Sequence, residues 1–208
     1  MRDDLRRRYS DRMILLEQLR SNLEQETREA LADLPHIDRV TFRVKTADPF
    51  VAKAEDPKND PPYQAPLVEI EDQVAGRVIV FFLSDLAAVH ERFAGTYSTI
   101  EHSQRRPERD AEFGYESNHL ICVIPPHLKP SGWDVQHDMP STFELQIRTL
   151  FMHAYAEPQH DIGYKAAHDL PSEIRRELAW IAASAWGADQ AFERVWKWNK
   201  DRPTNESS

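Results

Sequence analysis

The apolar run from Val78 to Phe82 limits the possible folds of this chain more than any other segment. An unbroken apolar run of this kind is typical of a strand that is covered on both faces. Such a strand needs neighbouring strands in a sheet and helices packed on that sheet. We therefore expect this run to form the most buried strand of a layered structure.

Helical and extended patterns surround this strand. Residues 3–33 repeat apolar side chains at three- and four-residue steps, which predicts one helix with an apolar face. Further strands are expected at 40–46, 118–126 and 141–149, and further helices at 84–97, from Met152, and at 171–199. Residues 48–66 and 103–117 are polar and are expected to form loops, the first of which begins with a short helix. This order predicts an α+β fold with a mixed sheet of about five strands flanked by helices.

Charge and cysteine content restrict the class of protein. The net charge of −9 argues against a general nucleic-acid binder. No apolar run approaches the roughly 20 residues that cross a bilayer, and no apolar signal-peptide core follows the N-terminal charges. The single cysteine, Cys122, has no internal disulfide partner and lies in an apolar run, so we expect it to be buried filler. These features predict a cytoplasmic protein without a membrane partner.

Basic residues gather near the first predicted strand. Arg43 and Lys45 are two apart, so both side chains point to one face of that strand, and Lys53 follows in the next segment. Together they could hold a polyphosphate, and an arginine adds a planar surface on which a base can stack. A solvent-exposed strand face would produce the same pattern. Arg77, at the edge of the buried strand, needs a partner, either a ligand or a carboxylate.

Two acidic residues stand out from their surroundings. Asp72 lies in a turn that enters the buried strand, and the small residues Ala75 and Gly76 after it would suit a metal held close to the backbone. Glu144 is an acid inside an otherwise apolar strand, where an unpaired charge is costly. Mg²⁺ typically takes one or two protein carboxylates together with substrate phosphates. The two acids therefore predict a Mg²⁺ site at a cleft.

Polar groups also follow the last predicted strand. Glu144, Gln146 and Arg148 share one face of it, because side chains two apart point the same way. Leu145 and Ile147 point to the opposite face. The strand therefore has one polar face and one apolar face.

Four further residues complete the pattern. His153 and Glu157 are four apart, so a helix places both on one side. Tyr115 lies at a loop end before the strand that carries His119, where it could stack on a base or pack on the surface. Two acids, several cations and a stacking aromatic fit nucleotide phosphoryl transfer, in which positioning and charge neutralisation do most of the work.

Four segments, RVKT, EDQVAGRVIV, GYESNH and FELQIRTLFMHAYAEPQHDIGYK, resemble the RelA/SpoT synthetase family in their order and spacing. The resemblance covers about residues 40–166, and the length resembles the small single-domain members. It implies a nucleotidyltransferase-like fold. The expected division is a single synthetase domain at 1–200, with helical ends at 3–33 and 171–199 and a disordered tail at 201–208. The implied reaction moves pyrophosphate from ATP to the 3′-hydroxyl of GDP or GTP, which yields ppGpp or pppGpp and AMP.

The resemblance also implies residue roles. In the donor site, the adenine of ATP would lie between Arg43 and Arg77. The phosphates of ATP would be bound by Lys45 and Lys53. The Mg²⁺ ligands would be two acids, the second of which would also help to deprotonate the attacking hydroxyl: Asp72 and Glu144. In the acceptor site, Tyr115 would stack on guanine. Three polar residues would line the same site: His119, Gln146 and His153. Two further matches have no assigned role: Arg148 and Lys165.

The chain departs from the family pattern near the acceptor. Glu116 stands where the family commonly has arginine, and Arg105, Arg106 and Arg109 replace a lysine-containing lead-in. The small residues of DQVAGR are shifted by one position. The acceptor is therefore open, because related toxins pyrophosphorylate the 3′ end of tRNA and others make adenosine alarmones. The acidic net charge disfavours tRNA, whereas a local arginine patch would favour it.

Two other functions fit less well. The i, i+4, i+7 spacing of His153, Glu157 and His160 could bind zinc, but Pro158 would disturb that helix and no H-E-x-x-H pattern is present. An inactive scaffold is a further alternative, against which the two retained acids argue.

The C-terminal helical stretch is rich in aromatic residues: Trp180, Trp186, Phe192, Trp196 and Trp198. Such a density is more typical of core packing than of an interface. Small synthetases of the family are often oligomers built through their helices. The resemblance therefore also implies a homo-oligomer through the terminal helices.

Overall fold

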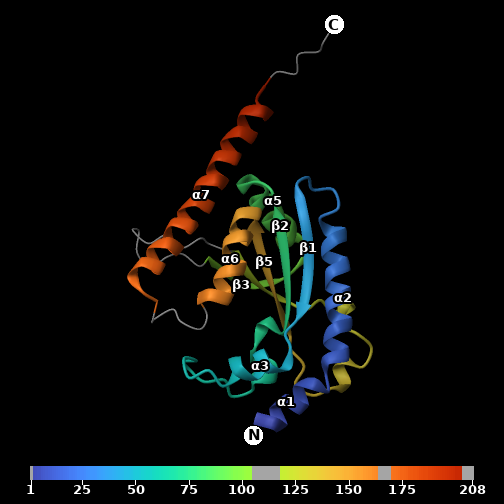
Figure 1. Cartoon of the computed structure of the whole chain (residues 1–208). Helices are drawn as coiled ribbons and strands as arrows, with labels where there is room; N and C mark the ends of the chain where they lie inside the picture. Colours follow the sequence, from blue (N-terminus) through green and yellow to red (C-terminus); the bar gives the residue numbers. More distant parts are fainter. Residues whose placement is uncertain (1, 105–117, 164–169, 203–208) are drawn as a thin grey trace.

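The computed structural model describes residues 2–104, 118–163 and 170–202. Within them, five strands form one sheet in the order β1-β2-β5-β4-β3 (Figure 1). These are β1 (Ile37–Val44), β2 (Val74–Val80), β3 (Thr99–Gln104), β4 (Asn118–Val123) and β5 (Thr142–Thr149). Strands β2 and β5 are parallel, and the other neighbours are antiparallel. The predicted fold class, a mixed sheet of about five strands flanked by helices, is confirmed.

Helices lie on both sides of this sheet. They are α1 (Arg2–Ser10), α2 (Met13–Ala30), α3 (Ala47–Ala54), α4 (Pro66–Glu69), α5 (Leu83–Thr96), α6 (Leu150–Gly163) and α7 (Ser172–Lys200). Short 3₁₀ turns lie at Glu71–Gln73, Pro126–Leu128 and Trp133–Val135. Helices α2 and α5 cover one face of the sheet, α6 lies over the other, and α7 extends past the sheet (Figure 1). In the part of the chain that is described, no helix has the length and apolar character needed to cross a membrane.

The apolar core fills the space between the sheet and helices α2 and α5. Leu19 of α2 and Phe93 of α5 are fully buried there, as are Leu145 and Ile147 of β5. This is the apolar face that the alternation in β5 predicts. Cys122 of β4 is buried in the same core, as expected, and burial raises the pKa of its thiol to about 11.

Strand β2 is longer than the predicted strand, and it begins and ends earlier in the sequence. Val78, Ile79 and Val80 are fully buried, which confirms cover on both faces. The strand ends at Val80, however, so Phe81 and Phe82 are not part of it. Phe82 instead precedes α5, where its backbone N–H donates a hydrogen bond to Asp85. An acid in the first turn of a helix caps its free N–H groups, and this explains where the sheet segment stops.

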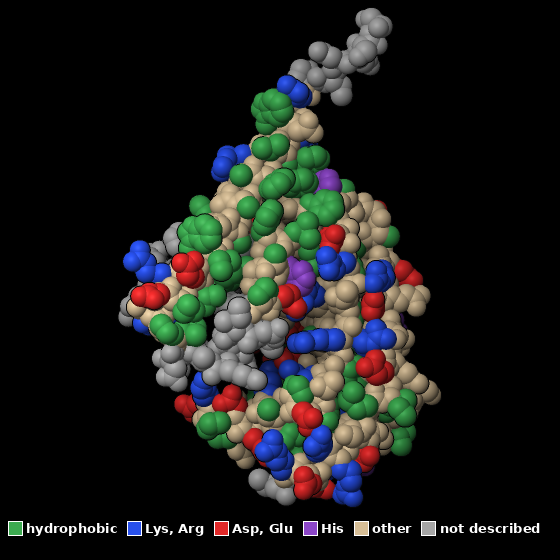
Figure 2. All heavy atoms as spheres, in the orientation of Figure 1, with side chains coloured by type: hydrophobic (Ala, Val, Ile, Leu, Met, Phe, Trp, Pro, Cys, Tyr) green, Lys and Arg blue, Asp and Glu red, His purple; other side chains and the backbone are tan. Residues whose placement is uncertain are grey.

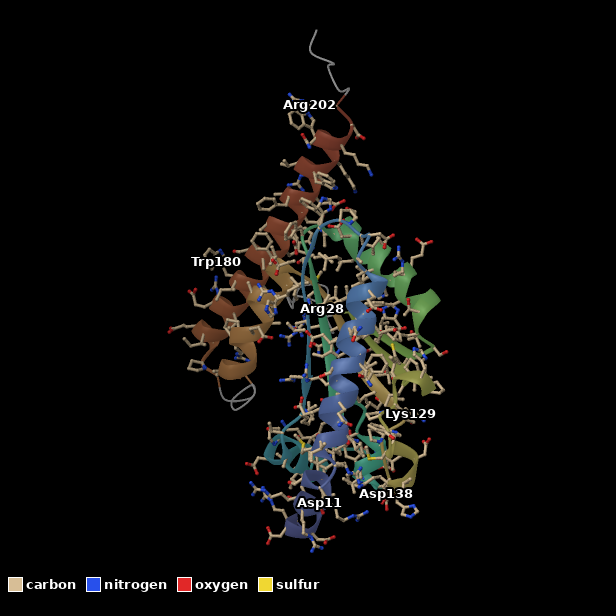
Figure 3. All side chains as sticks on the ribbon, turned by 90° about the vertical axis from the view of Figure 1, so that its right-hand side faces the viewer. Asp11, Arg28, Lys129, Asp138, Trp180 and Arg202 are labelled. Carbon is tan, nitrogen blue, oxygen red and sulfur yellow. The ribbon has the colours of Figure 1, made fainter. Side chains whose placement is uncertain are left out.

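The N-terminal helix at 3–33 was predicted as one piece, and this is wrong. It breaks between α1 and α2, because Arg12 is drawn into tertiary contacts and donates a hydrogen bond to the carbonyl oxygen of Asp138 at 2.5 Å. Figure 3 shows Asp138 close to this break and to Asp11. Tyr9 also anchors the end of α1, stacking on Phe50 at 3.8 Å between ring centroids. The apolar spacing continues across the break and therefore gave no sign of it.

The polar loop predicted at 103–117 begins inside a strand. Strand β3 includes Ser103 and Gln104 and pairs with β4, so the prediction is wrong for its first two residues. β3 lies at the edge of the sheet, and its sequence TIEHSQ lacks the apolar alternation that would reveal a strand. Residues 105–117 lie outside the described residues.

Helix α7 makes polar contacts with the rest of the fold, one with the end of β5 and one with the start of α5. Thr149, at the end of β5, donates a hydrogen bond to the buried Asp189 at 2.5 Å, and the backbone N–H of Ser84 donates to Glu193 at 3.0 Å. The expectation that the tryptophans pack in a core is wrong for three of them. Trp180, Trp186 and Trp198 are 68%, 49% and 58% exposed.

Figure 3 shows Trp180 on the outer side of α7. Trp196 differs from these three, because its ring stacks on Phe82 at 4.9 Å. The aromatic residues of α7 are therefore largely exposed, and Trp196 anchors them to the start of α5.

Candidate active site

The polar groups singled out from the sequence lie on the sheet face opposite the core. The register sets Arg43 opposite Ala75, and Ala75 in turn beside Glu144. It sets Arg77 beside Gln146, and Gln146 opposite His119. Residues directly opposite each other share a face, so four strands contribute to one surface. Figure 2 shows basic and acidic side chains meeting around a recess on this side of the molecule.

Asp72 is held by two lysines. It lies in the turn Glu71–Gln73 that leads into β2, and its carboxylate pairs with Lys45 at 2.9 Å and Lys53 at 3.0 Å. Burial opposes its ionisation, but the charges and hydrogen bonds of the lysines outweigh burial, so the pKa of Asp72 lies below its ordinary value. Asp72 is therefore ionised at neutral pH, and both lysines are directed to the same point.

Glu144 is held by its neighbours on the sheet. Its Oε1 lies 2.6 Å from His119 Nδ1, and its Oε2 accepts a hydrogen bond from Gln146 at 3.0 Å. Burial would raise the pKa of Glu144, but the bond from His119 and its charge outweigh this, and the pKa lies below its ordinary value. This carboxylate is also ionised at neutral pH.

The two acids could hold Mg²⁺ together with substrate phosphates. They are close enough for the charge of Asp72 to disfavour ionisation of Glu144. Burial, the nearby Glu101 and then Glu144 and Asp72 raise the pKa of Glu71, so this part of the site is rich in acid. Among the described side chains, no group of three could hold a metal by itself. Mg²⁺ usually binds one or two protein carboxylates together with substrate phosphates, and two acids would suit this. A structural metal site, by contrast, is closed by protein ligands alone.

A small pocket lies beside this cluster, between strands β1 and β2. Its volume is about 90 Å³, and its lining residues are Thr41, Phe42, Arg43, Ala75, Gly76, Arg77 and Gln146. A Cβ added at Gly76 would lie 2.5 Å from Phe42 Cε1 and 2.7 Å from Leu145 Cδ2. Core packing is therefore sufficient to explain why residue 76 is a glycine, and a metal close to the backbone is not needed for that explanation.

The partner that Arg77 was expected to need is a carboxylate. Arg77 Nη1 lies 2.6 Å from Glu157 Oε1 of α6. The same oxygen is 3.7 Å from Arg148 and 3.8 Å from His153 Nδ1, so the predicted neighbourhood of His153 and Glu157 on one helix face is present. Helix α6 continues through Pro158, which therefore does not end it. The side chain of His160 lies outside the described residues, so the proposed zinc triad is not seen as a whole.

Several predicted residues fall outside the part of the chain that is described. These are Tyr115, Glu116 and Lys165, and the arginines of the lead-in, Arg105, Arg106 and Arg109. The described site therefore consists of the donor-side cations, the two acids and three of the four acceptor-side residues: His119, Gln146 and His153.

Sequence reasoning overlooked two acids near this site, and it overlooked one contact of a third acid that it had singled out. Glu71 precedes Asp72 in the same turn, and that adjacency was an available signal. Glu101 lies on β3, a strand that was not predicted. The contact of Glu157 with Arg77 joins residues 80 positions apart, and no local pattern reveals it.

Comparisons with known proteins agree with this architecture. The family model for the region found in RelA and SpoT proteins matches residues 42–169. GTP pyrophosphokinase YjbM of Bacillus subtilis (strain 168) is 28% identical over 163 residues, which cover 76% of this chain and 72% of the relative.

Solved structures show a similar fold. The small alarmone synthetase 1 of Bacillus subtilis matches with a TM-score of 0.74 and 20% identity, covering 93% of this chain and 98% of its own. The same enzyme bound to its product pppGpp matches with a TM-score of 0.70 and 21% identity, covering 91% and 96%. The family model matches more than half of the 208-residue chain, and on this ground the chain belongs to the RelA/SpoT family.

Proposed function

We propose that this chain transfers pyrophosphate from ATP to the 3′-hydroxyl of GDP or GTP, making ppGpp or pppGpp and AMP. The observation that carries the proposal is the carboxylate of Asp72 between Lys45 and Lys53, close to the ionised Glu144. Phosphate-binding cations and metal-binding acids at one point suit phosphoryl transfer, which depends on charge neutralisation. The relatives named GTP pyrophosphokinase and small alarmone synthetase support the same reaction.

The donor side of the reaction follows from the basic groups. Arg43 and Arg77, neighbours on the sheet face, would stack on the two faces of the adenine. Lys45 and Lys53 would bind the ATP phosphates. Lys53 has a raised pKa, because the attraction of Asp72 outweighs the effect of burial, so it carries its charge at neutral pH.

The two acids indicate how the metal ion would be bound. Asp72 and Glu144 would hold Mg²⁺ together with the ATP phosphates, and the ion would neutralise charge that develops on them. An acid that stays ionised is a good ligand and a weak base. The lowered pKa of Glu144 therefore favours ligation as its main role, with help in deprotonating the acceptor hydroxyl as a second.

The acceptor side would use His119 and Gln146, which stand beside Glu144 on the sheet, and His153 on α6. Tyr115 would stack on the acceptor base. The reaction uses cytoplasmic nucleotides, and the single cysteine requires no oxidising compartment, so we place the protein in the cytoplasm, with residues 1–200 as one synthetase domain.

One experiment tests the substrate. The protein is incubated with Mg²⁺ and γ-labelled ATP, and separately with GDP, GTP, ADP, ATP or deacylated tRNA, and labelled products are resolved. We expect label in ppGpp or pppGpp together with release of AMP. Label transferred to tRNA or to adenine nucleotides alone would replace the proposed acceptor, and no transfer to any acceptor would refute the reaction.

We further propose a homo-oligomer that forms through the terminal helices. The exposed tryptophans and Phe192 of α7 present an apolar surface that a second copy would cover. Size-exclusion chromatography with light scattering at several concentrations tests this. A monomer at every concentration would refute it, and a shift toward monomer in Trp180→Ala would support it.

A further inference from the structure

Glu157 is an acid placed beside two arginines and a histidine. It projects from α6 over the polar face of the sheet, and its Oε1 lies 2.6 Å from Arg77 Nη1. The same oxygen is 3.7 Å from Arg148 Nη1 and 3.8 Å from His153 Nδ1. Only the first distance is that of a hydrogen bond, so the carboxylate binds Arg77 and only lies near Arg148 and His153.

Arg77 needs this partner for electrostatic reasons. Burial lowers the pKa of its guanidinium, the attraction of Glu157 opposes that, and the repulsion of Arg43 adds to it. Arg43 and Arg77 are neighbours on one sheet face, because Arg43 lies two residues from Thr41, the residue opposite Arg77. Two guanidiniums that must face a common gap repel each other, and an acid bound to one of them reduces that cost.

The direction of the contact matters as much as its charge. A guanidinium donates its hydrogen bonds in its own plane, whereas a base stacks on its face. A carboxylate bound at the edge therefore restricts the orientation of the plane and does not itself cover either face. In the described part of the chain, Arg77 Nε is buried without a hydrogen-bond partner, so the bond to Glu157 is the contact that sets the orientation.

We propose that Glu157 is a positioning residue for the donor nucleotide: it holds the guanidinium of Arg77 by its edge so that the face can stack on the adenine of ATP. This inference rests on the proposed function for its substrate. It adds a determinant of ATP affinity that lies on α6, outside the segments that carry the phosphate-binding and acidic groups. Glu157 touches Arg77 and not the reacting atoms.

The test separates donor binding from chemistry. In Glu157→Gln, KM for ATP is expected to rise roughly three- to tenfold, because a charge-assisted hydrogen bond to a half-exposed group is replaced by a neutral one. kcat and KM for GDP are expected to stay within about twofold of wild type. The affinity for a non-hydrolysable ATP analogue, measured by calorimetry, should fall by the same factor as KM rises.

Two matched variants complete the design. Glu24→Gln is the control, because Glu24 also joins two arginines, Arg20 and Arg28, but on α2 on the opposite side of the sheet. It should leave KM for ATP unchanged. In an Arg77→Ala background, Glu157→Gln should have no further effect on analogue binding, since the group that it positions is gone.

Three results would overturn the proposal. An unchanged KM for ATP in Glu157→Gln would show that the contact does not orient Arg77. A lower KM would show that Glu157 competes with the nucleotide instead of preparing its site. An equal loss of affinity in the Arg77→Ala background would show that Glu157 acts independently of Arg77. If wild type binds the analogue but transfers no pyrophosphate, the proposed function fails while the calorimetric test of Glu157 stands.

Discussion

Replacement of Gly76 by alanine is expected to destabilise the protein by packing alone. The added Cβ would lie 2.5 Å from Phe42 Cε1 and 2.7 Å from Leu145 Cδ2, well inside ordinary van der Waals contact. Both neighbours belong to the core and sit on strands to either side of β2, so neither can move away freely. Overpacking of a core costs about 1–3 kcal/mol, and two simultaneous clashes place Gly76→Ala near about 3 kcal/mol.

The effect is measurable by thermal and urea unfolding. For a chain of this size about 1 kcal/mol shifts Tm by roughly 2–4 °C, so Gly76→Ala should lower Tm by about 6–12 °C. Gly95→Ala is the matched control, because a Cβ at this position in α5 would meet nothing within 4 Å, and alanine in a helix should stabilise by about 0.5–1 kcal/mol. Phe42→Leu should reduce the cost of Gly76→Ala by removing the ring. A Tm of Gly76→Ala equal to wild type would refute this account of the packing.

Three further outcomes are expected. Because the pKa values of Asp72 and Glu144 lie below 3.8 and 4.5, their stabilisation is complete above these values and is lost as the pH falls through the lower folded values. The stability of Asp72→Asn should therefore fall less than that of wild type as the pH falls below 3.8 in urea titrations, and parallel curves would contradict this. Thr149→Val removes the bond to buried Asp189 and should cost about 1–3 kcal/mol of unfolding free energy, whereas no loss would show that this bond does not secure α7. Tyr115→Ala should weaken acceptor use by roughly ten- to a hundredfold with ATP binding unchanged, and equal loss of both would argue against base stacking.

The sheet and its polar face were accessible from sequence because both depend on local periodicity. Alternation alone assigned Leu145 to the core and Glu144 to the opposite face, and apolar spacing identified the buried face of α2. The break at Arg12 was not accessible, since its cause is a contact with Asp138 far along the chain. β3 was missed because an edge strand with polar residues carries no apolar alternation.

The candidate site also contains some contacts that the sequence predicts and others that it does not. Residues two apart on a strand could be placed together in advance, as with Glu144 and Gln146. For contacts between distant elements, the sequence could indicate only that a residue needs a partner. Arg77 was expected to have one, and the structure identifies it as Glu157. The aromatic residues of α7 were misjudged because tryptophan content does not indicate whether a helix face meets a core or solvent.

The most direct test of the proposed reaction compares wild type with variants of its two acids in the presence of Mg²⁺, γ-labelled ATP and GDP. Wild type should form labelled ppGpp, whereas Asp72→Asn and Glu144→Gln should each lose activity by about a hundredfold or more while keeping the circular dichroism of the fold. Asp33→Asn, which breaks an exposed pair with Arg92, is the control and should retain the wild-type rate. Near-wild-type synthesis of ppGpp by folded Asp72→Asn or Glu144→Gln would contradict the central role given to these acids.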